Sequence, residues 1–235
     1  MIKLYRFPPL GSLPSASPFC VKVEAYLRLA GIEYEPRDMH DPRKAPKGKL
    51  PFIRDGETVI ADSSAIIDYL EKSDRGDALD KDLNPAERAT ALAYRRMMEE
   101  HTYFCIVHMR WARDEVWPEV KDRYFSAMPI PLRWIVPGVA QKQVRRDLHG
   151  QGIGRHSDAE INAMALADLR AISVFLGDKP FFLGESPTTL DATGYGFLTS
   201  VLRAPFKSPI RAEIDELKNL AAYCARLDAQ YFADG

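Results

Sequence analysis

Long apolar runs, net charge and cysteine are all scarce in this chain of 235 residues. Its most apolar later stretch, residues 130–140, is interrupted by an arginine and two prolines, far short of the roughly 20 apolar residues that span a bilayer. The 32 lysines and arginines nearly balance the 33 aspartates and glutamates, so no overall field recruits nucleic acid or an anionic membrane. We therefore expect a soluble protein that reads its partners through a local site.

The three cysteines, Cys20, Cys105 and Cys224, are too few and too widely spaced for a disulfide framework or a zinc site. The first seven residues lack the apolar core and cleavage site of a secretion signal. These absences predict a cytoplasmic protein. A content of 46% hydrophobic and 28% charged residues is typical of an ordinary globular chain and excludes a disordered or collagen-like one.

Short β-like and helical segments alternate up to about residue 76, which predicts an α/β unit, and the pattern of residues 84–235 is helical. In the first part we expect the order β-α-β-β-β-α, with strands at 2–7, 32–37, 52–54 and 58–61 and helices at 18–30 and 63–72. Asn84 begins an amphipathic helix of roughly thirty residues that ends near Glu115. Further helices are expected from Ser157, from Thr188 and from about Glu213.

The first candidate site is the helix start at Ser17 and Pro18. Backbone N–H groups and the helix dipole favour an anion there, so a thiolate beside the Ser17 hydroxyl would be stabilised. The same two residues also make an ordinary N-cap. Cys20 lies on the apolar stripe of this helix, which favours a packing role over a reactive one. Tyr5 is the rival for thiolate stabilisation, although its place within a strand favours core packing.

Two further motifs could bind a peptide-like ligand. A cis bond before Pro51 would turn the Leu50 backbone outward, where it can pair with an extended peptide, although a proline at a strand edge is also a common turn device. Asp62 and Ser63 open another helix, whose N–H groups suit a carboxylate while Asp62 suits an ammonium. The pair therefore fits an α-amino acid group, and taken alone it is a good N-cap.

Together these motifs resemble the glutathione transferase superfamily over nearly the whole chain. The resemblance implies a thioredoxin-like domain at 1–76, followed by an all-α domain at 84–235. It implies glutathione as co-substrate, with Ser17 as the catalytic residue beside its sulfur. It also implies five glutathione-binding residues: Lys49, Leu50, Pro51, Asp62 and Ser63. Residues 187–192 resemble the family's buried capping box.

In this family the middle of the long helix faces the opening between the domains. The side chains that would form an apolar co-substrate wall there are Tyr103, Phe104, His108 and Trp111; a bundle core is the alternative. His101 and His108 are too far apart for the usual helical metal pair, so we expect no metal. A basic run over residues 142–155 is most simply a solvated face, and an acidic partner is the weaker alternative.

Finer similarity, carried by residues 17–22, 47–52 and 151–156, is to the subgroup of failed axon connections proteins and metaxins. The resemblance implies a homodimeric glutathione transferase that conjugates small electrophilic, largely apolar compounds, as in detoxification. One alternative is a non-catalytic binding module that contacts another protein through the segment 117–156, which its prolines and glycines predict to be irregular. The other is a glutathione-linked thiol reductase acting through Cys20.

Overall fold

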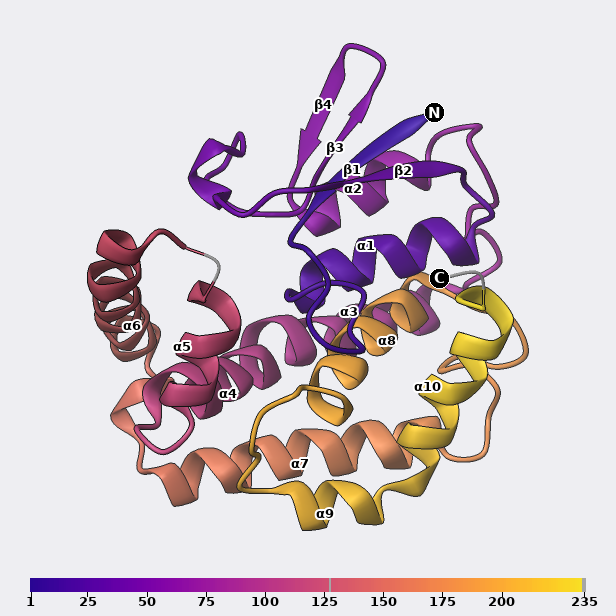
Figure 1. The fold of residues 1–235 in the computed structure, drawn as a ribbon. Coiled ribbons are helices and arrows are strands. Elements are labelled where there is room, and N and C mark those ends of the chain that lie inside the picture. Colours follow the sequence, from indigo (N-terminus) through magenta and orange to yellow (C-terminus); the bar gives the residue numbers. More distant parts are fainter. Residues whose placement is uncertain (127, 234–235) are drawn as a thin grey trace. The chain divides into compact units, whose positions relative to one another are not determined.

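The computed structural model describes residues 1–126 and 128–233. These residues pack as two compact units. The first consists of residues 1–95, 173–204 and the chain from 218 onward, and the second of residues 96–172 and 205–217. The elements of both units are labelled in Figure 1.

A four-stranded mixed sheet in the order β2-β1-β3-β4 lies in the first unit (Figure 1). β1 (Ile2–Arg6) pairs parallel with β2 (Tyr34–Asp38) and antiparallel with β3 (Phe52–Asp55). β3 continues into β4 (Thr58–Ala61) through a tight turn that contains Gly56 at φ 59°, the positive value that such hairpin turns need. The predicted β-α-β-β-β-α order is confirmed, with β2 beginning two residues later than expected.

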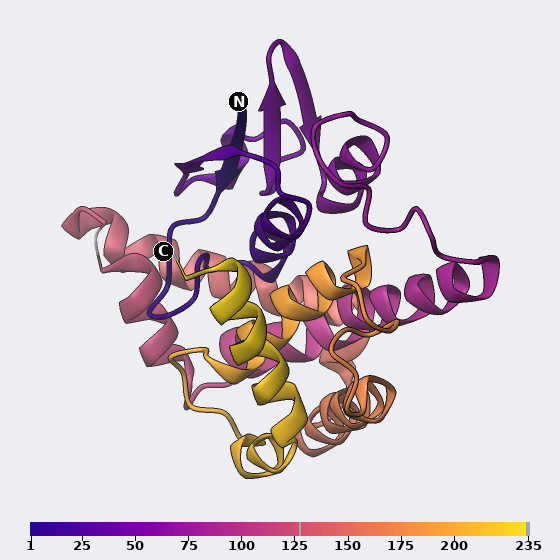
Figure 2. The ribbon, with the colours of Figure 1, turned by 90° about the vertical axis from the view of Figure 1, so that its right-hand side faces the viewer.

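Helices cover this sheet within the same unit. α1 (Pro18–Leu29) lies between the sheet and α8 (Thr189–Leu202), as Figure 2 shows. A Cβ atom added to Gly196 of α8 would lie 2.7 Å from the carbonyl oxygen of Pro18, so the absence of a side chain lets the two helices approach. The remaining elements are η1 (Pro42–Lys44), α2 (Ser63–Leu70), most of α3 (Pro85–Met97), the end of α7 (Asp158–Leu176) and α10 (Lys218–Tyr231).

Three of the capping residues predicted from the sequence make the expected hydrogen bonds, whereas the Ser17 hydroxyl makes none to the start of its helix. Asn84 Oδ1 accepts from the Glu87 backbone at 3.0 Å, and Glu87 Oε2 accepts from the Asn84 backbone at 2.9 Å. The same reciprocal pattern opens α7 at Ser157 and α8 at Thr188. These three helix starts are therefore confirmed, because each depends only on residues within one turn.

The long helix expected from Asn84 to Glu115 is continuous from Pro85 to Ala112 but is not α-helical throughout. After α3 the chain forms the π-helical segment η2 (Met98–Thr102), the helix α4 (Tyr103–Val107) and a second π-helical segment, η3 (His108–Ala112). A π-helical turn holds one residue more than an α-helical turn, so each segment shifts the side chains that follow it around the axis. The predicted long helix is thus confirmed from Pro85 to Ala112, but its side chains do not follow one regular α-helical face.

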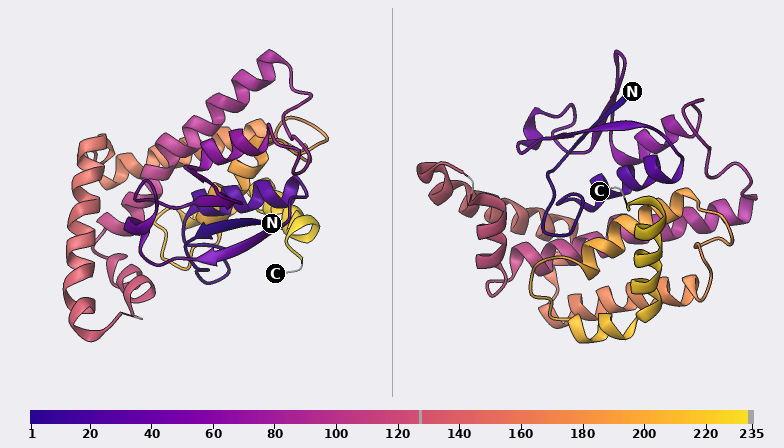
Figure 3. Two further views of the ribbon diagram at one scale, coloured as in Figure 1. Left: turned by 90° about the horizontal axis from the view of Figure 1, so that it is seen from above. Right: turned by 45° about the vertical axis from the view of Figure 1, so that its right-hand side comes forward.

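The expectation that residues 117–156 are irregular was also wrong for its described part, which is largely helical. α5 (Trp117–Phe125) and α6 (Ile130–Gln151) each carry a proline in the first turn, where a missing N–H costs no hydrogen bond. α6 continues through Pro137, ends at Gly152 and is followed by η4 (Ile153–Arg155); both helices can be followed in Figure 3. The second unit is completed by α9 (Arg211–Glu216) and the first part of α7.

None of the described helices combines the length and the apolar character that crossing a membrane requires.

Candidate functional site

The first turn of α1 carries the predicted catalytic serine. Ser17 is half-buried at the N-cap with an extended backbone (φ −112°, ψ 127°), and its hydroxyl does not cap the helix. The fully buried Cys20 follows one turn later. Burial raises the pKa of the Cys20 thiol to about 11, although the hydroxyls of Ser15 and Ser17 act in the opposite direction. At neutral pH this thiol keeps its proton and is a poor nucleophile.

The peptide bond between Leu50 and Pro51 is cis. Leu50 and Phe52 pack in one buried cluster with Cys20 of α1, which joins this loop to the helix that begins at Ser17. The Tyr5 ring stacks on Phe52 with 4.2 Å between ring centroids, so Tyr5 packs with this cluster. Of the predicted neighbours, Pro51 is buried and Lys49 is exposed.

Asp62 holds the start of α2 in an uncommon backbone conformation. Its φ of 93° lies in the region that side chains rarely adopt. Asp62 Oδ1 accepts hydrogen bonds from the backbone of Ser64 at 3.0 Å and of Ala65 at 3.1 Å. The Asp62 side chain is exposed and that of Ser63 is buried. A backbone outlier of this kind costs about 1–3 kcal/mol and persists only where the surrounding structure holds it in place. Such outliers occur often at binding sites.

A buried lysine that the sequence reasoning missed joins α1 to α2. Lys22 has no exposed surface, and its Nζ lies 3.2 Å from Ser63 Oγ and 3.2 Å from Ser64 Oγ. A lysine is almost never fully buried unless its ammonium is satisfied by partners. Lys22 lies off the apolar stripe of Cys20, Val23 and Leu27, and it is buried because α1 is covered on nearly all sides, which the periodicity of the sequence does not indicate. Through Cys20 and Lys22, α1 contacts both the cis-proline loop and the Asp62-Ser63 helix start.

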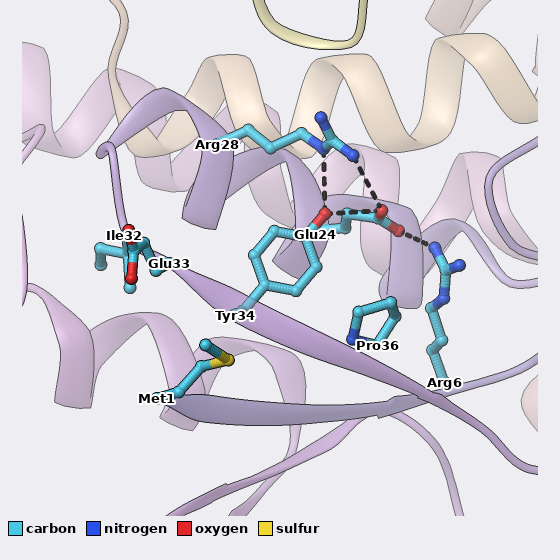
Figure 4. A pocket seen from close by; sticks show the side chains of 8 residues that line it. All are labelled: Met1, Arg6, Glu24, Arg28, Ile32, Glu33, Tyr34 and Pro36. Atoms are coloured by element: carbon cyan, nitrogen blue, oxygen red, sulfur yellow. Dashed lines mark hydrogen bonds and ion pairs between the residues drawn. The ribbon is translucent and has the colours of Figure 1, made fainter. Parts of the chain in front are cut away.

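A separate pocket of about 490 Å³ lies between α1 and β2 (Figure 4). Glu24, 3% exposed, is ion-paired with Arg6 and accepts a hydrogen bond from the Tyr34 hydroxyl at 2.8 Å. Arg28 Nε donates to the same hydroxyl at 2.9 Å. The side chains of Arg6, Glu24, Arg28 and Tyr34 are therefore bonded to one another within the pocket. None of the predicted site residues lines this pocket. Its remaining lining residues are Met1, Ile32, Glu33 and Pro36.

The four candidates for a co-substrate wall lie in the second unit, on α4 and η3. Tyr103 and Phe104 meet edge to face with 5.2 Å between centroids, and both are half-buried. Trp111 packs instead with aromatic residues of α5, at 5.7 Å from Trp117 and 5.4 Å from Tyr124. Tyr103 and Phe104 therefore contact each other, and Trp111 contacts aromatic residues of α5.

Two buried basic side chains adjoin these aromatic groups. His108 is 8% exposed, and burial lowers the pKa of its imidazole although Asp158, 3.6 Å from Nε2, opposes the shift. Arg110, which the sequence reasoning also missed, lies over the Phe206 ring at 5.5 Å from its centroid. Burial lowers the pKa of the Arg110 guanidinium as well. Among the described residues, no three His, Cys, Asp or Glu side chains come together as a possible metal site.

Comparison with known proteins identifies the family. Residues 18–116 match the family model of the glutathione S-transferase N-terminal domain, and residues 165–227 that of its C-terminal domain. Over 98% of the chain and 99% of the relative, the sequence is 34% identical to isoprene-epoxide--glutathione S-transferase of Rhodococcus sp. (strain AD45). The chain belongs to the glutathione S-transferase family.

Two other relatives of the chain are proteins of the subgroup that its motifs predict. Failed axon connections of Drosophila melanogaster is 34% identical over 100% of the chain, which spans 59% of that protein. Metaxin-1 of Macaca fascicularis is 30% identical over 94% of the chain and 72% of the relative. The predicted resemblance to the subgroup is thereby confirmed.

Solved structures confirm the predicted glutathione transferase fold. The structure of beta-etherase LigF from Sphingobium sp. strain SYK-6 matches with a TM-score of 0.66 at 18% identity, covering 100% of the chain and 99% of that structure. A glutathione S-transferase of Ceriporiopsis subvermispora in complex with glutathione matches with a TM-score of 0.65 at 20% identity, covering 99% and 96%.

Proposed function

We propose that this chain is a glutathione transferase that joins the glutathione thiolate to a small, largely apolar electrophile. The observation that carries the proposal is the double contact of α1. Cys20 packs with Leu50 of the cis-proline loop, and Lys22 donates to Ser63 at the start of α2. One helix, which begins at Ser17, therefore touches both of the other motifs that the family uses for glutathione.

In this proposal glutathione lies along the first unit. Its γ-glutamyl carboxylate takes the N–H and the hydroxyl of Ser63, with the Lys22 ammonium behind them, because Asp62 already accepts from the Ser64 and Ala65 backbones. Its amino group faces the Asp62 carboxylate. The cysteinyl backbone pairs with Leu50, flanked by Pro51 and Lys49. The sulfur lies beside the Ser17 hydroxyl.

The Ser17 hydroxyl and the start of α1 would lower the thiol pKa of bound glutathione. A free thiol has a pKa of about 8.5, and lowering it by one to two units is worth about 1.4–2.7 kcal/mol. One hydrogen bond and the partial positive charge at a helix start supply energies of that size. No further cofactor takes part in the proposed reaction.

Epoxides are the electrophile class to test first, because the relative from Rhodococcus is named for an isoprene epoxide. The thiolate attacks one ring carbon and forms the C–S bond while the C–O bond of the ring breaks. The electron pair of that bond stays on oxygen, which then takes a proton from water. We assign Tyr103, Phe104, His108 and Trp111 to the wall that receives the epoxide.

The test combines calorimetric titration with glutathione and thioether formation with a model epoxide. We expect binding by the unaltered chain, and loss of thioether formation but not of binding in Ser17→Ala. Ser12→Ala, an equal change at an exposed serine of the preceding loop, is the control and keeps both.

Two outcomes would overturn the proposal. Absence of binding at millimolar glutathione would favour a non-catalytic module, a possibility raised by the similarity to failed axon connections and metaxin-1. A glutathione-linked reductase would instead lose turnover in Cys20→Ser and keep it in Ser17→Ala.

A cytoplasmic homodimer that detoxifies electrophiles completes the proposal. Light scattering coupled to gel filtration tests the oligomeric state, and a monomer at micromolar concentration would contradict that part alone. Fractionation of cells that produce the chain tests its compartment.

A further inference from the structure

A fully buried serine lies two residues before Ser17, in the loop that joins β1 to α1. Ser15 has no exposed surface, whereas Ser17 is half-buried. Between β1 and α1 the chain forms turns and bends, with Leu10 bridged to Leu13. A hydroxyl buried in such a loop needs hydrogen-bond partners in the protein, because burial removes it from water.

The Ser15 hydroxyl joins the end of β1 to the start of α1. Its Oγ donates to the carbonyl oxygen of Phe7, the residue that follows β1, at 2.7 Å. The same oxygen accepts a hydrogen bond from the Ser17 N–H at 3.5 Å. One side chain therefore bonds to the backbone on both sides of the loop.

These contacts hold the backbone of Ser17 from two directions. Its N–H donates to Ser15, and its carbonyl oxygen accepts from the N–H groups of Cys20 at 3.0 Å and of Val21 at 3.1 Å. The direction of the Cα–Cβ bond follows from the positions of the backbone atoms. With the backbone held, rotation about that bond is the one freedom left to the hydroxyl.

Phe7 extends this restraint to the loop that precedes β3. Its side chain packs against the buried cluster that contains Leu50. In the proposed function Leu50 pairs with the cysteinyl backbone of glutathione, and the Ser17 hydroxyl meets the sulfur of the same cysteinyl unit. The contacts of Phe7 and Ser15 therefore set the distance between the two groups that hold that unit.

We propose that Ser15 is a positioning residue of the reaction, which holds the Ser17 hydroxyl where it can donate to the glutathione sulfur. The proposal rests on the proposed function, because Ser15 acts through Ser17. Ser15 touches no substrate itself, since it is fully buried. A hydrogen-bond donor contributes most to catalysis when it is already in place before the charge develops.

The pKa of the bound glutathione thiol measures this positioning directly. The ultraviolet absorption of the thiolate, followed as the pH is raised, gives that pKa. The net contribution of one hydrogen bond corresponds to about one pKa unit, so Ser15→Ala, which loosens that bond without removing it, should raise the thiol pKa by about 0.5–1 unit. Ser17→Ala should raise it further.

A raised thiol pKa also changes how the rate depends on pH. Near neutral pH the thiolate fraction falls, so Ser15→Ala should form the thioether about three- to tenfold more slowly than the unaltered chain. Above the shifted pKa both proteins hold the thiolate, and their rates should converge. A serine that only supported the fold would instead lower the rate by the same factor at every pH.

Ser73→Ala is the matched control. The Ser73 hydroxyl also donates to a backbone carbonyl, that of Leu70 at 2.8 Å, and accepts from the N–H two residues further on, that of Arg75 at 3.4 Å. Ser73 follows the C-terminal end of α2, whereas the residues assigned to glutathione lie at its other end. This variant should keep the thiol pKa of the unaltered chain.

Two further measurements guard against a folding defect. S-methylglutathione has no thiol to ionise, so its calorimetric titration should change little in any variant and shows that the site is folded. Ser15→Cys keeps a weaker hydrogen-bonding group of similar size and should give a smaller pKa shift than Ser15→Ala. It tests the same role if Ser15→Ala does not fold.

Two results separate this inference from the proposed function. If Ser17→Ala leaves the thiol pKa unchanged, the proposed function is wrong and the role of Ser15 falls with it. If Ser17→Ala raises the pKa while Ser15→Ala leaves it unchanged, or lowers the rate equally at every pH, the role of Ser15 alone is wrong.

Discussion

Replacing Lys22 by methionine tests whether the buried ammonium belongs to the glutathione site or only to the core. Methionine keeps the length and apolar character of the side chain and removes its charge. Lys22 Nζ lies 3.2 Å from Ser63 Oγ, the hydroxyl proposed to meet the γ-glutamyl carboxylate. If that hydroxyl donates to the carboxylate, the ammonium and the carboxylate are separated by one serine oxygen.

The magnitude follows from Coulomb's law. Two opposite charges about 6 Å apart, in surroundings with an effective dielectric constant of about 20, attract each other by about 3 kcal/mol. Since 1.4 kcal/mol corresponds to a factor of ten, removing the charge should weaken glutathione binding about 100-fold. The attraction acts far from the sulfur and equally in ground and transition states, so KM for glutathione should rise while kcat changes little.

Steady-state kinetics against glutathione and calorimetric titration measure the effect. Lys72→Met, an equal loss of charge at an exposed lysine after α2, is the control and should change KM less than twofold. Thermal unfolding completes the assay. Replacing a buried charge by an apolar residue of similar volume is often neutral or stabilising, so Lys22→Met should unfold no earlier than the unaltered chain.

An unchanged KM in a folded Lys22→Met variant would refute this reasoning, because the charge would then act on nothing in the site. A KM that rises only together with a fall in melting temperature would also refute it, since the lysine would then serve the core alone.

Three further predictions concern stability. Gly196→Ala should lower the free energy of unfolding in urea by about 1–2 kcal/mol, because the added methyl group would lie 2.7 Å from the Pro18 carbonyl oxygen. This loss exceeds the gain of about 1 kcal/mol in helix propensity. Unchanged stability would show that α1 and α8 separate easily. Asp191→Asn should lower the free energy of unfolding by about 2–4 kcal/mol, because the fully buried carboxylate accepts hydrogen bonds from the Phe182 and Thr188 backbones at 2.9 and 2.8 Å and an amide nitrogen cannot accept one. A variant within about 1 kcal/mol of the parent in the same assay, roughly the value of one hydrogen bond, would contradict this prediction. Burial raises the pKa of the Cys20 thiol to about 11, so the thiol's contribution to the free energy of unfolding is complete below about pH 8.5 and is lost as the pH rises through 11. Cys20→Ala should reduce the slope of stability against pH in that range and keep thioether formation. An unchanged slope would count against the buried thiol.

Features that depend on a few neighbouring residues could be predicted from the sequence. The capping boxes at Asn84, Ser157 and Thr188 each close within one turn, and the hairpin at Gly56 needs only its own turn residues. The family also followed from local motifs at Ser17, Leu50 and Asp62. Whether those residues bind glutathione stays a prediction.

The tertiary structure decided what distant residues do to one another. In the sequence Lys22 is one more polar residue of a helix. In the fold its ammonium lies 3.2 Å from the hydroxyls of Ser63 and Ser64, which are more than forty positions away in the chain. The exposure of residues 130–135, the first turns of α6, likewise depends on what the fold places beside that helix, and periodicity over a proline-containing segment does not determine that. Local patterns set where helices and strands begin because backbone hydrogen bonds close over a few residues, whereas buried charges and uncovered surfaces result from packing between remote parts of the chain.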